Sequence, residues 1–532
     1  MGIQNIPTEV LSGVIGFLSW SSDANRWGPA VELADLRSAR LVCRQWNALA
    51  SAHMFREVAL LHTTDGKDFD NFKKLTASPT VQQAARCAGI YSGPHHFGHD
   101  MTKDNGRSYE DWDQWKDGDY EEFTDAIDCI ANLPKLHNVH IRFGEGCSGV
   151  PDSDYGFESG VEEFSTRLNA LQAVFSAIAE RKARGSNTAI TTLAIENLQN
   201  KPIPDLISTI TALAIENLRN RAMPDVIPTP DFISADFFGS VVKDITNLRL
   251  LIAHEYNEAG PDHDLDCVER RTFEPWLQTE LLPLFANQLT SLHLSFQENW
   301  GVAPGYFDGK DLVFPHLKNL TLGEFVIGHH DQFDWVLAQK NLETLRLDRC
   351  VIVSHLAFFV GHSRDPHNAL RDWDVRTHDW REYPTWSFGM HDGKKSFTFS
   401  GTWETVFDAI RSRLTNLVDF RMGHVSYRGD NHFNTIEHMR CTLPNARYIV
   451  LDTGLLPSPW ITADEHTGNM DFGNNNPAVL EPENRTSRGS RQGRMELNRA
   501  KETLEGDTRA LMKLVRAVED RRRQKGLPQI ST

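Results

Sequence analysis

The chain has 532 residues, and its 55 basic and 72 acidic side chains give a formal net charge of −17 at pH 7. So acidic a chain argues against non-specific binding to nucleic acid or to anionic membranes. The seven cysteines are scattered without short pairs, which is typical of free thiols in a reducing compartment. No apolar run approaches the roughly 20 residues that a membrane-spanning helix needs. We therefore expect a cytoplasmic or nuclear protein without nucleic-acid or membrane partners.

Two amphipathic helical patterns lie within residues 5–60. Pro7 stands where a helix can begin, and a first apolar stripe follows at helical spacing. It consists of Val10, Leu11, Val14, Ile15 and Leu18. After a polar interval with Gly28 and Pro29 comes a second stripe, made of Leu36, Ala39, Cys43, Trp46 and Ala50 and widened by Leu33, Leu41, Val42 and Leu49. So short a helical pair has more apolar surface than it can bury internally, so part of it must face the rest of the chain or another protein.

The order of these residues resembles an F-box. The two halves are Ile6-Pro7-x-Glu9-Val10-Leu11 and Leu36-x3-Arg40-Leu41-Val42-Cys43-Arg44-Gln45-Trp46. In that family the helices bind a Skp-type adaptor, which links them to a cullin in an SCF-type ubiquitin ligase. The resemblance implies adaptor contacts at Ile6, Pro7, Val10, Leu11, Ile15, Leu18, Leu36, Val42, Cys43 and Trp46.

Two features leave room for other interpretations. The polar segment from Trp20 to Glu32 is longer than the family's usual connection, and it is either a surface insertion or a change that weakens adaptor contact. Alternatively, both helices only cap the larger domain.

The resemblance extends to about the first ninety residues, as in fungal F-box proteins. The elements expected there are a first strand within residues 53–61, a helix at 69–75, and a short helix and strand within 80–93.

A second pattern, with apolar residues at the first, fourth and sixth positions, recurs along the chain. It begins at Leu136, Ile190, Ile210, Leu289, Leu317, Leu342, Leu417 and Ala446, with a weaker candidate at residues 247–251. Each unit predicts a short strand whose alternate side chains face one interior. The pattern resembles the L-x-x-L-x-L core of a leucine-rich repeat, which recurs every 20–29 residues or so. We therefore expect an α/β fold in which residues 56–460 form an irregular leucine-rich-repeat-like solenoid of parallel strands, with helices at 161–184 and 403–414 on its outer side.

Three segments interrupt the repeats. Residues 95–128 are acidic with interleaved aromatics, and form either a solvated loop or a patch for a basic partner. Residues 190–209 are nearly duplicated at 210–229, and the second copy either stacks as a narrow repeat or loops out. Residues 363–400 carry Trp373, Trp380, Tyr383 and Trp386, which either contribute to substrate capture or pack against the solenoid.

The composition changes again near the C-terminus. Residues 461–494 lack apolar periodicity and predict a disordered linker. Residues 495–532 predict a charged helical tail ending in the basic run Arg521–Lys525. The basic run could dock on an acidic surface or serve as a nuclear-import signal; the alternative is a solvated helix end without a special role.

Motifs for catalysis and cofactors are weak. Gly144-x-Gly146-x-x-Gly149 matches the glycine pattern of a dinucleotide-binding loop. It is followed by Val150-Pro151 rather than by a helix whose N-terminus could bind the pyrophosphate, so we do not expect a dinucleotide site. The histidines at 95, 96, 99, 329 and 330 lack a ligand constellation. We therefore expect no enzyme activity, cofactor or metal. The chain, with its helical module at residues 1–55, is expected to be the substrate-recognition subunit of the ligase, with a protein substrate; the alternative is a leucine-rich-repeat scaffold without a ligase role.

Overall fold

The computed structural model forms two compact units. The first comprises Met1–Gln199, Ile203–Tyr256 and Ser426–Thr435, and the second comprises Asn200–Pro202, Asn257–Val425 and Ile436–Thr532. The solenoid expected over residues 56–460 is thus divided, and the N-terminal helices belong to the first unit. The structure describes residues 6–18, 33–62, 67–92, 121–144, 147–148, 162–199, 241–253, 268–302, 305–359, 379–383, 394–424, 433, 436, 439–452, 455–458, 461–464, 470–472, 494–496 and 499–529.

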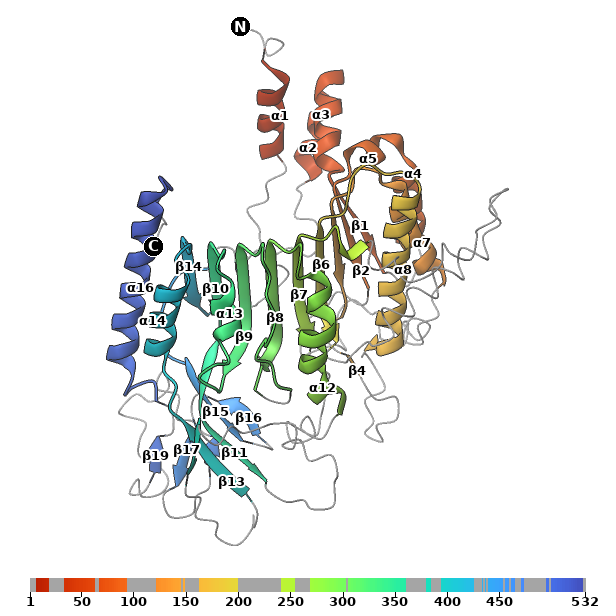
Figure 1. Cartoon of the computed structure of the whole chain (residues 1–532). Coiled ribbons are helices and arrows are strands. Elements are labelled where there is room, and N and C mark those ends of the chain that lie inside the picture. Colours follow the sequence, from red (N-terminus) through yellow and green to blue (C-terminus); the bar gives the residue numbers. More distant parts are fainter. Residues whose placement is uncertain are drawn as a thin grey trace, which may run out of the picture. The chain divides into compact units, whose positions relative to one another are not determined.

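The fold is mixed α/β with a largely parallel sheet that does not close, which confirms the expected class (Figure 1). In the described part of the first unit, five parallel strands pair in the order β1–β2–β3–β6–β7. Their bounds are Glu57–Leu61, Cys87–Tyr91, Asn138–Arg142, Thr192–Gln199 and Asn247–Ala253. The buried side chains of Val58, Ala88, Val139, Leu193 and Leu248 align in register across the sheet, and alternate residues point to the other side.

The helices that follow the strands of the first unit cover this apolar face. They are α4 (Lys67–Ala77), α5 (Pro79–Ala84), α7 (Glu121–Asp128), η3 (Cys129–Asn132) and α8 (Phe164–Ala183). Before the first strand, α1 (Thr8–Phe17), α2 (Leu33–Ala39) and α3 (Arg44–Met54) form a separate module. The short strands β4 (Cys147–Ser148) and β5 (Glu162–Glu163) pair with each other. The other side of the sheet, which we call the opposite face, carries residues such as Gly89, Tyr91, His140, Ala194 and Arg249.

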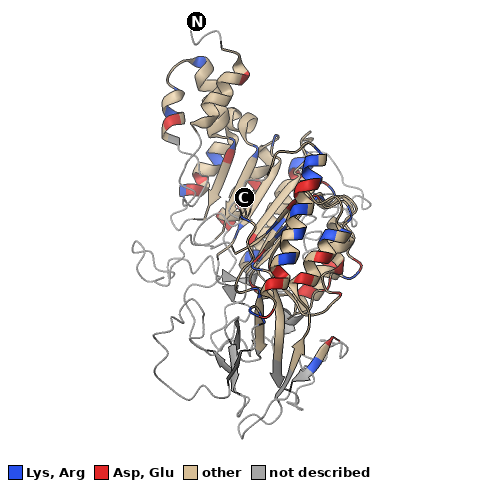
Figure 2. Cartoon of the chain, turned by 90° about the vertical axis from the view of Figure 1, so that its left-hand side faces the viewer, with Lys and Arg blue, Asp and Glu red and all other residues tan. Residues whose placement is uncertain are grey.

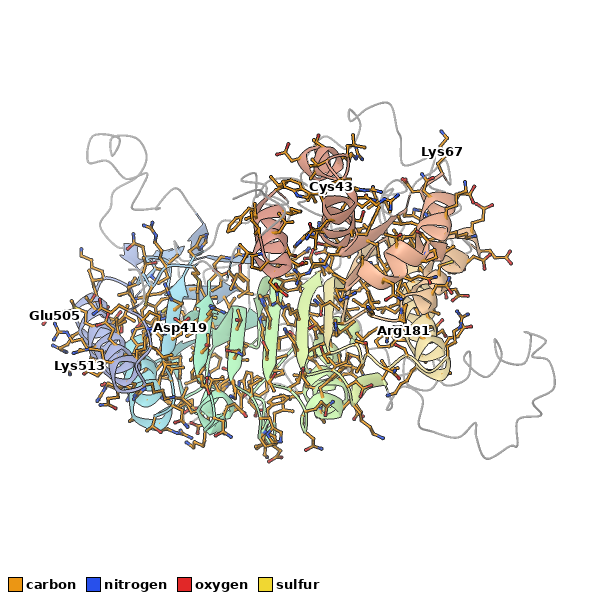
Figure 3. All side chains as sticks on the ribbon, turned by 90° about the horizontal axis from the view of Figure 1, so that it is seen from above. Cys43, Lys67, Arg181, Asp419, Glu505 and Lys513 are labelled. Atoms are coloured by element: carbon orange, nitrogen blue, oxygen red, sulfur yellow. The ribbon has the colours of Figure 1, made fainter. Side chains whose placement is uncertain are left out.

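A buried arginine fixes the end of α8. Arg181 donates to the backbone oxygens of Leu133 and Pro134 at 2.7 Å, of Leu136 at 3.0 Å and of Thr188 at 2.6 Å. Its side chain is labelled in Figure 3. Burial lowers the pKa of Arg181 to about 10, so the group remains charged at neutral pH. The guanidinium satisfies carbonyl groups of the turn before β3 and of the segment between α8 and β6, which binds the helix to both connections.

The second unit repeats the same arrangement. Parallel strands pair in the order β8–β9–β10–β14, with bounds Ser291–Trp300, Asn319–Ile327, Thr344–Asp348 and Asp419–Gly423. Leu292, Leu320, Leu345 and Phe420 align in register and are buried. The accompanying helices are α12 (Val268–Trp276), η5 (Leu277–Leu281), η6 (Leu282–Phe285), α13 (Asp334–Ala338), α14 (Trp403–Arg413) and α16 (Leu504–Gln524).

The parallel strands begin with one shared hydrogen-bond pattern. In β2, β3, β6, β7, β9, β10 and β14, the first strand residue and the residue before it both donate their backbone N–H to one carbonyl at the entry of the preceding strand. Lys318 and Asn319 donate to Thr290, and Glu343 and Thr344 donate to Lys318. The same pairs of donors recur at residues 86–87, 137–138, 191–192, 246–247 and 418–419. The apolar residue two positions before the strand is buried in all seven cases, at Ala85, Leu136, Ile190, Ile245, Leu317, Leu342 and Leu417.

Three residues near the carboxyl ends of the strands share one unusual backbone conformation. Asn197 and Glu324 lie inside β6 and β9, just after the regular part of the pairing, and Arg349 follows β10; their φ values are 61°, 61° and 48°. This left-handed conformation is unfavourable for residues other than glycine and needs local support. Asn197 obtains it by donating to the Phe143 backbone oxygen at 2.9 Å, while Glu324 and Arg349 pair with each other at 2.7 Å.

The series then branches, which corrects the expected order of repeats. β10 covers only the first half of β9, so Val326 and Ile327 are left to pair with β11 (Val351–Phe359). β15 (Tyr448–Asp452) comes from the copy of the repeated sequence pattern that begins at Ala446, and it pairs with β11 and not with β14. β11 also pairs antiparallel with β13 (Lys394–Phe399), β13 with β12 (Trp380–Tyr383), and β15 with β16 (Leu455–Ser458).

The three interrupting segments have different outcomes. Within residues 363–400, β12 and β13 form and Trp380 is buried, which agrees with packing for that residue; Trp373, Trp386 and the Tyr383 side chain lie outside the described residues. The end of the acidic segment forms α7, but residues 95–120 lie outside the described residues, as does the whole second copy at 210–229.

The C-terminal region also differs from expectation. The expected linker contains β17 (Ile461–Asp464) and β18 (Met470–Phe472), which form a small antiparallel sheet with β19 (Arg494–Glu496). The helix expected in the tail is α16, and it packs on α14. Among the helices that the structure describes, none has the length and apolarity to cross a membrane.

Candidate functional site

Helix α1 carries two apolar stripes that face different surroundings. Leu11 and Ile15 are buried against α2 and α3, where Leu36, Ala39 and Ala50 complete a small core with partly buried Leu18, Trp46, Leu49 and Met54 around it. Val10, Val14 and Phe17 follow the spacing i, i+4 and i+7, which places them on one side of the helix. That stripe lies about 100° around the helix from Leu11 and Ile15, because each residue turns the helix by that angle.

The three helices are held together by specific contacts. Ser12 Oγ lies 3.1 Å from His53 Nε2, and a Cβ at Gly16 would lie 3.0 Å from the His53 ring, so α1 and α3 approach closely at this point. Arg40 donates to Asn47 Oδ1 at 3.0 Å, and its guanidinium lies 5.6 Å from the centre of the Phe55 ring. The module is therefore ordered by its own residues, and α3 further contacts α5 of the same unit.

The second stripe remains exposed. The exposed fractions are 56% for Val10, 52% for Val14 and 69% for Phe17. At the turn between α2 and α3, Leu41 is 88% exposed and Val42 is 61% exposed, and Ile6 is 36% exposed. We call these six side chains the outer apolar residues. Glu9 is the one charged residue of α1, and the N-terminal helices are largely tan in Figure 2. A concentration of large exposed apolar side chains marks a protein-interaction surface.

The structure separates the adaptor contacts implied by the resemblance into three groups. Ile6, Pro7, Val10, Val42 and Cys43 are exposed, and Cys43 is labelled on these helices in Figure 3. Leu18 and Trp46 are partly buried. Leu11, Ile15 and Leu36 are buried in the core of the module, so in this structure they support the surface and do not belong to it.

Three outer apolar residues were not among the implied contacts. They are Val14, Phe17 and Leu41. The helical spacing from Val10 to Val14 and Phe17 was a usable signal, because it defines a stripe distinct from that of Leu11 and Ile15. Leu41 carries no comparable signal, because its exposure depends on where α2 ends.

The opposite face of the first unit's sheet holds a buried ionic cluster. Glu196 Oε1 lies 3.1 Å from His140 Nε2, and the other carboxylate oxygen accepts a hydrogen bond from Arg142. Burial alone raises the pKa of Glu196, but His140 and then Arg142 outweigh this and hold the pKa at about 2. Glu196 is therefore ionised at neutral pH, and its charge fixes the orientation of both partners.

The described residues offer little for covalent or metal chemistry. Among them, no group of three or more His, Cys, Asp or Glu is arranged to hold a metal ion. Burial raises the pKa of the Cys87 thiol to about 12 and those of Cys350 and Cys441 above their ordinary value. These thiols are protonated at neutral pH and are poor nucleophiles.

Comparisons with known proteins give no family for the chain. A scan against models of known protein families found no match, and a search of curated proteins found no relative.

Proposed function

We propose that this chain is the substrate-recognition subunit of an SCF-type cullin ubiquitin ligase. The observation that carries the proposal is the exposure of Val10, Val14, Phe17, Leu41 and Val42 on a helical module whose core is already complete. These side chains are not needed to hold the module together, yet water contacts them at an energetic cost. A Skp-type adaptor that covers them would remove that cost, in agreement with the resemblance of residues 6–46 to an F-box.

The remainder of the chain suits the presentation of a protein substrate. Two recurring features support the interpretation that both compact units are built from leucine-rich-repeat-like repeats. They are the hydrogen bonds at the start of the strands and the buried apolar residue two positions before them. Such repeats leave one face of the sheet without helices, and in the first unit that face carries the partly exposed side chains of His140 and Arg249. Charged and aromatic groups of this kind recognise other proteins well.

The contribution to ubiquitin transfer would be proximity. A substrate held on the sheet and an adaptor held on the helices are joined in one chain, which raises the effective concentration of the substrate near the ubiquitin-charged enzyme. The chemical step belongs to other subunits of the ligase, and no residue of this chain needs to take part in it.

The test is binding of the full chain to a recombinant Skp-type adaptor, measured by calorimetry. We expect a one-to-one complex. Val14→Asp should weaken it by at least about tenfold, because an unpaired charge is then buried in the interface. Val313→Asp is the matched control, since Val313 is 57% exposed and Val14 is 52% exposed, but Val313 lies in the second unit. Absence of binding by the folded chain, or an equal effect of the two substitutions, would contradict the proposal.

The second candidate is a repeat scaffold in which the N-terminal helices only cap the first unit. It is favoured by the contact between α3 and α5 and by the inclusion of residues 1–55 in the first unit. Deletion of residues 1–55 distinguishes the two functions. The cap predicts that the deletion lowers the thermal stability of the first unit strongly, whereas the receptor predicts a folded remainder that no longer binds the adaptor.

A further inference from the structure

The side chain of Phe433 lies on the opposite face of the first unit's sheet. Its ring packs against Ala194 of β6 and Leu251 of β7, and all three side chains are buried. The guanidinium carbon of Arg249 lies 5.8 Å from the centre of the ring, and the His140 ring lies 6.2 Å from it. One aromatic side chain is thus surrounded by residues of three adjacent strands, β3, β6 and β7.

The shape of the site that holds the Phe433 ring follows from the order of residues across the sheet. His140, Ala194 and Arg249 are neighbours in register, so a small side chain stands between two large ones. We call the depression formed by His140, Ala194, Arg249 and Leu251 the aromatic seat. Beyond His140, the Tyr91 ring lies 6.0 Å away and closes the row.

The Tyr91 ring depends on a glycine. A Cβ atom at Gly89 would lie 2.7 Å from the Tyr91 ring, so the absence of a side chain at Gly89 allows the ring to fold back over β2. The Tyr91 ring therefore lies beside His140. The residues that flank His140 in register, Gly89 and Ala194, are both small.

The strands build the aromatic seat without help from Phe433. His140 is oriented by Glu196, which in turn is paired with Arg142. Ala194 and Leu251 are fixed by the backbone pairing of β6 and β7. Among the described residues, the buried cluster around Phe433 contains Ala194 and Leu251, and the pairing of β6 with β7 holds both in place, so removal of the Phe433 ring should leave these strands paired. The place is therefore prepared for an aromatic ring independently of the residue that fills it.

We propose that the aromatic seat is a binding subsite for a Phe, Tyr or Trp side chain of a partner protein, and that Phe433 occupies it as an internal competitor. The chemistry selects an aromatic ring, because Arg249 presents a cation to the ring and His140 approaches it at an angle. Under the proposed function, on which this inference rests for the identity of the partner, the partner is the ligase substrate. It must displace a residue of the same chain, which acts at an effective concentration in the millimolar range.

The first test uses a fluorescein-labelled peptide with the sequence of residues 426–435, SYRGDNHFNT, as the probe. In anisotropy titrations, the full-length Phe433→Ala chain should bind this peptide about tenfold or more tightly than the wild-type chain, in which the seat is filled. A control peptide with alanine in place of the phenylalanine should bind the variant about tenfold more weakly than the original peptide. Arg249→Gln in the Phe433→Ala background should weaken binding by about two- to fivefold, as expected for loss of a cation–π contact.

A second measurement leaves the fold unchanged. The wild-type chain with 4-fluorophenylalanine at position 433 should show a 19F resonance typical of a buried ring. Addition of the unlabelled peptide in millimolar excess should move the resonance toward the position of a solvent-exposed ring, while the alanine control peptide should leave it in place. Equal binding of both peptides by Phe433→Ala, or an unchanged resonance together with no binding by the variant, would overturn the proposal.

These experiments contain no adaptor, so their failure is distinguishable from failure of the proposed function. Phe433→Ala should bind a Skp-type adaptor as the wild-type chain does, because the outer apolar residues lie on α1, just before it, and on the turn after α2. Peptide binding without adaptor binding would keep the aromatic seat and reject the ligase role.

Discussion

Arg447 and Asp507 form an ion pair in the second unit, with Nε and Oδ2 2.8 Å apart and side chains 2% and 0% exposed. The Tyr448 hydroxyl donates to the same carboxylate at 3.0 Å, and the backbone N–H of Glu404 donates to its other oxygen at 2.9 Å. Asp507 thus connects α16 to the start of α14 and to the start of β15. The C-terminal helix is therefore part of the second unit.

The first prediction concerns this carboxylate. Asp507→Ala should lower the free energy of unfolding of the second unit by about 3–5 kcal/mol, because it leaves the Arg447 guanidinium buried without its partner. Glu505→Ala is the control on the same helix; the Glu505 side chain is 92% exposed and its loss should change stability by less than about 0.5 kcal/mol. Figure 3 labels Glu505 on the outer side of α16. Urea denaturation measures both, and similar effects of the two substitutions would show that the buried pair is dispensable.

The parallel strands were predictable because their cause is local. In the repeated pattern, residues such as Leu320 and Leu322 alternate with others, and a strand is the conformation that sends such residues to one side. The branch at β9 and the docking of α16 were not predictable in this way. They depend on pairs such as Arg447 and Asp507, which are far apart in the sequence, and on the unequal lengths of β9 and β10.

The candidate surface was predictable in place but not in detail. The sequence shows that α1 is apolar over a broad arc, but it does not tell which part faces the helical core. Leu11 and Val10 are adjacent and both apolar, and only the position of α3 makes one of them buried and the other exposed. Phe433 gave no sequence signal, because its ring fills a place formed by strands far earlier in the chain.

The second prediction distinguishes the two sides of α1. Ile15→Ala should destabilise the N-terminal helices by about 2–4 kcal/mol, because it creates a cavity in a core where Ile15 is 0% exposed. Val14→Ala, one residue away and 52% exposed, should change stability by less than about 0.5 kcal/mol. Hydrogen exchange of the α1 and α3 amides reports this directly. Equal protection in the two variants would mean that the small core does not hold the module together.

The third prediction concerns the buried arginine of α8. Arg181→Leu should lower the free energy of unfolding of the first unit by at least about 2 kcal/mol, since it removes the donors for the carbonyls of Leu133, Pro134, Leu136 and Thr188. Arg181→Lys should recover only part of the loss, because an ammonium group cannot reach all four oxygens. Arg184→Leu serves as control, since the Arg184 side chain is 47% exposed and bonds to side-chain oxygens at the surface. Denaturant unfolding that is the same for Arg181→Leu and Arg184→Leu would refute the role of the buried group.

The fourth prediction is a pH dependence set by Glu274 of α12. Burial raises the pKa of this carboxyl to about 8, although the backbone N–H groups of Glu274 and Gly305 oppose the shift. Below pH 4.5, its ordinary value, the group is protonated in both the folded and the unfolded chain. Between pH 4.5 and 8 the unfolded chain has released the proton while the folded chain retains it, so stability must fall as pH rises, by up to about 1.4 kcal/mol per pH unit.

Glu274→Gln removes this dependence, because the amide resembles the protonated carboxyl and does not titrate. The unfolding free energy of the variant minus that of the wild-type chain should therefore be constant below pH 4.5, rise between pH 4.5 and 8, and level off above pH 8. Glu280→Gln, at an exposed position in the following turn, should give a difference that stays nearly flat over the same range. Other titrating groups cancel in these differences, because they are the same in each pair of proteins. A flat difference for Glu274→Gln would mean that the buried carboxyl is already ionised in the folded chain at pH 7.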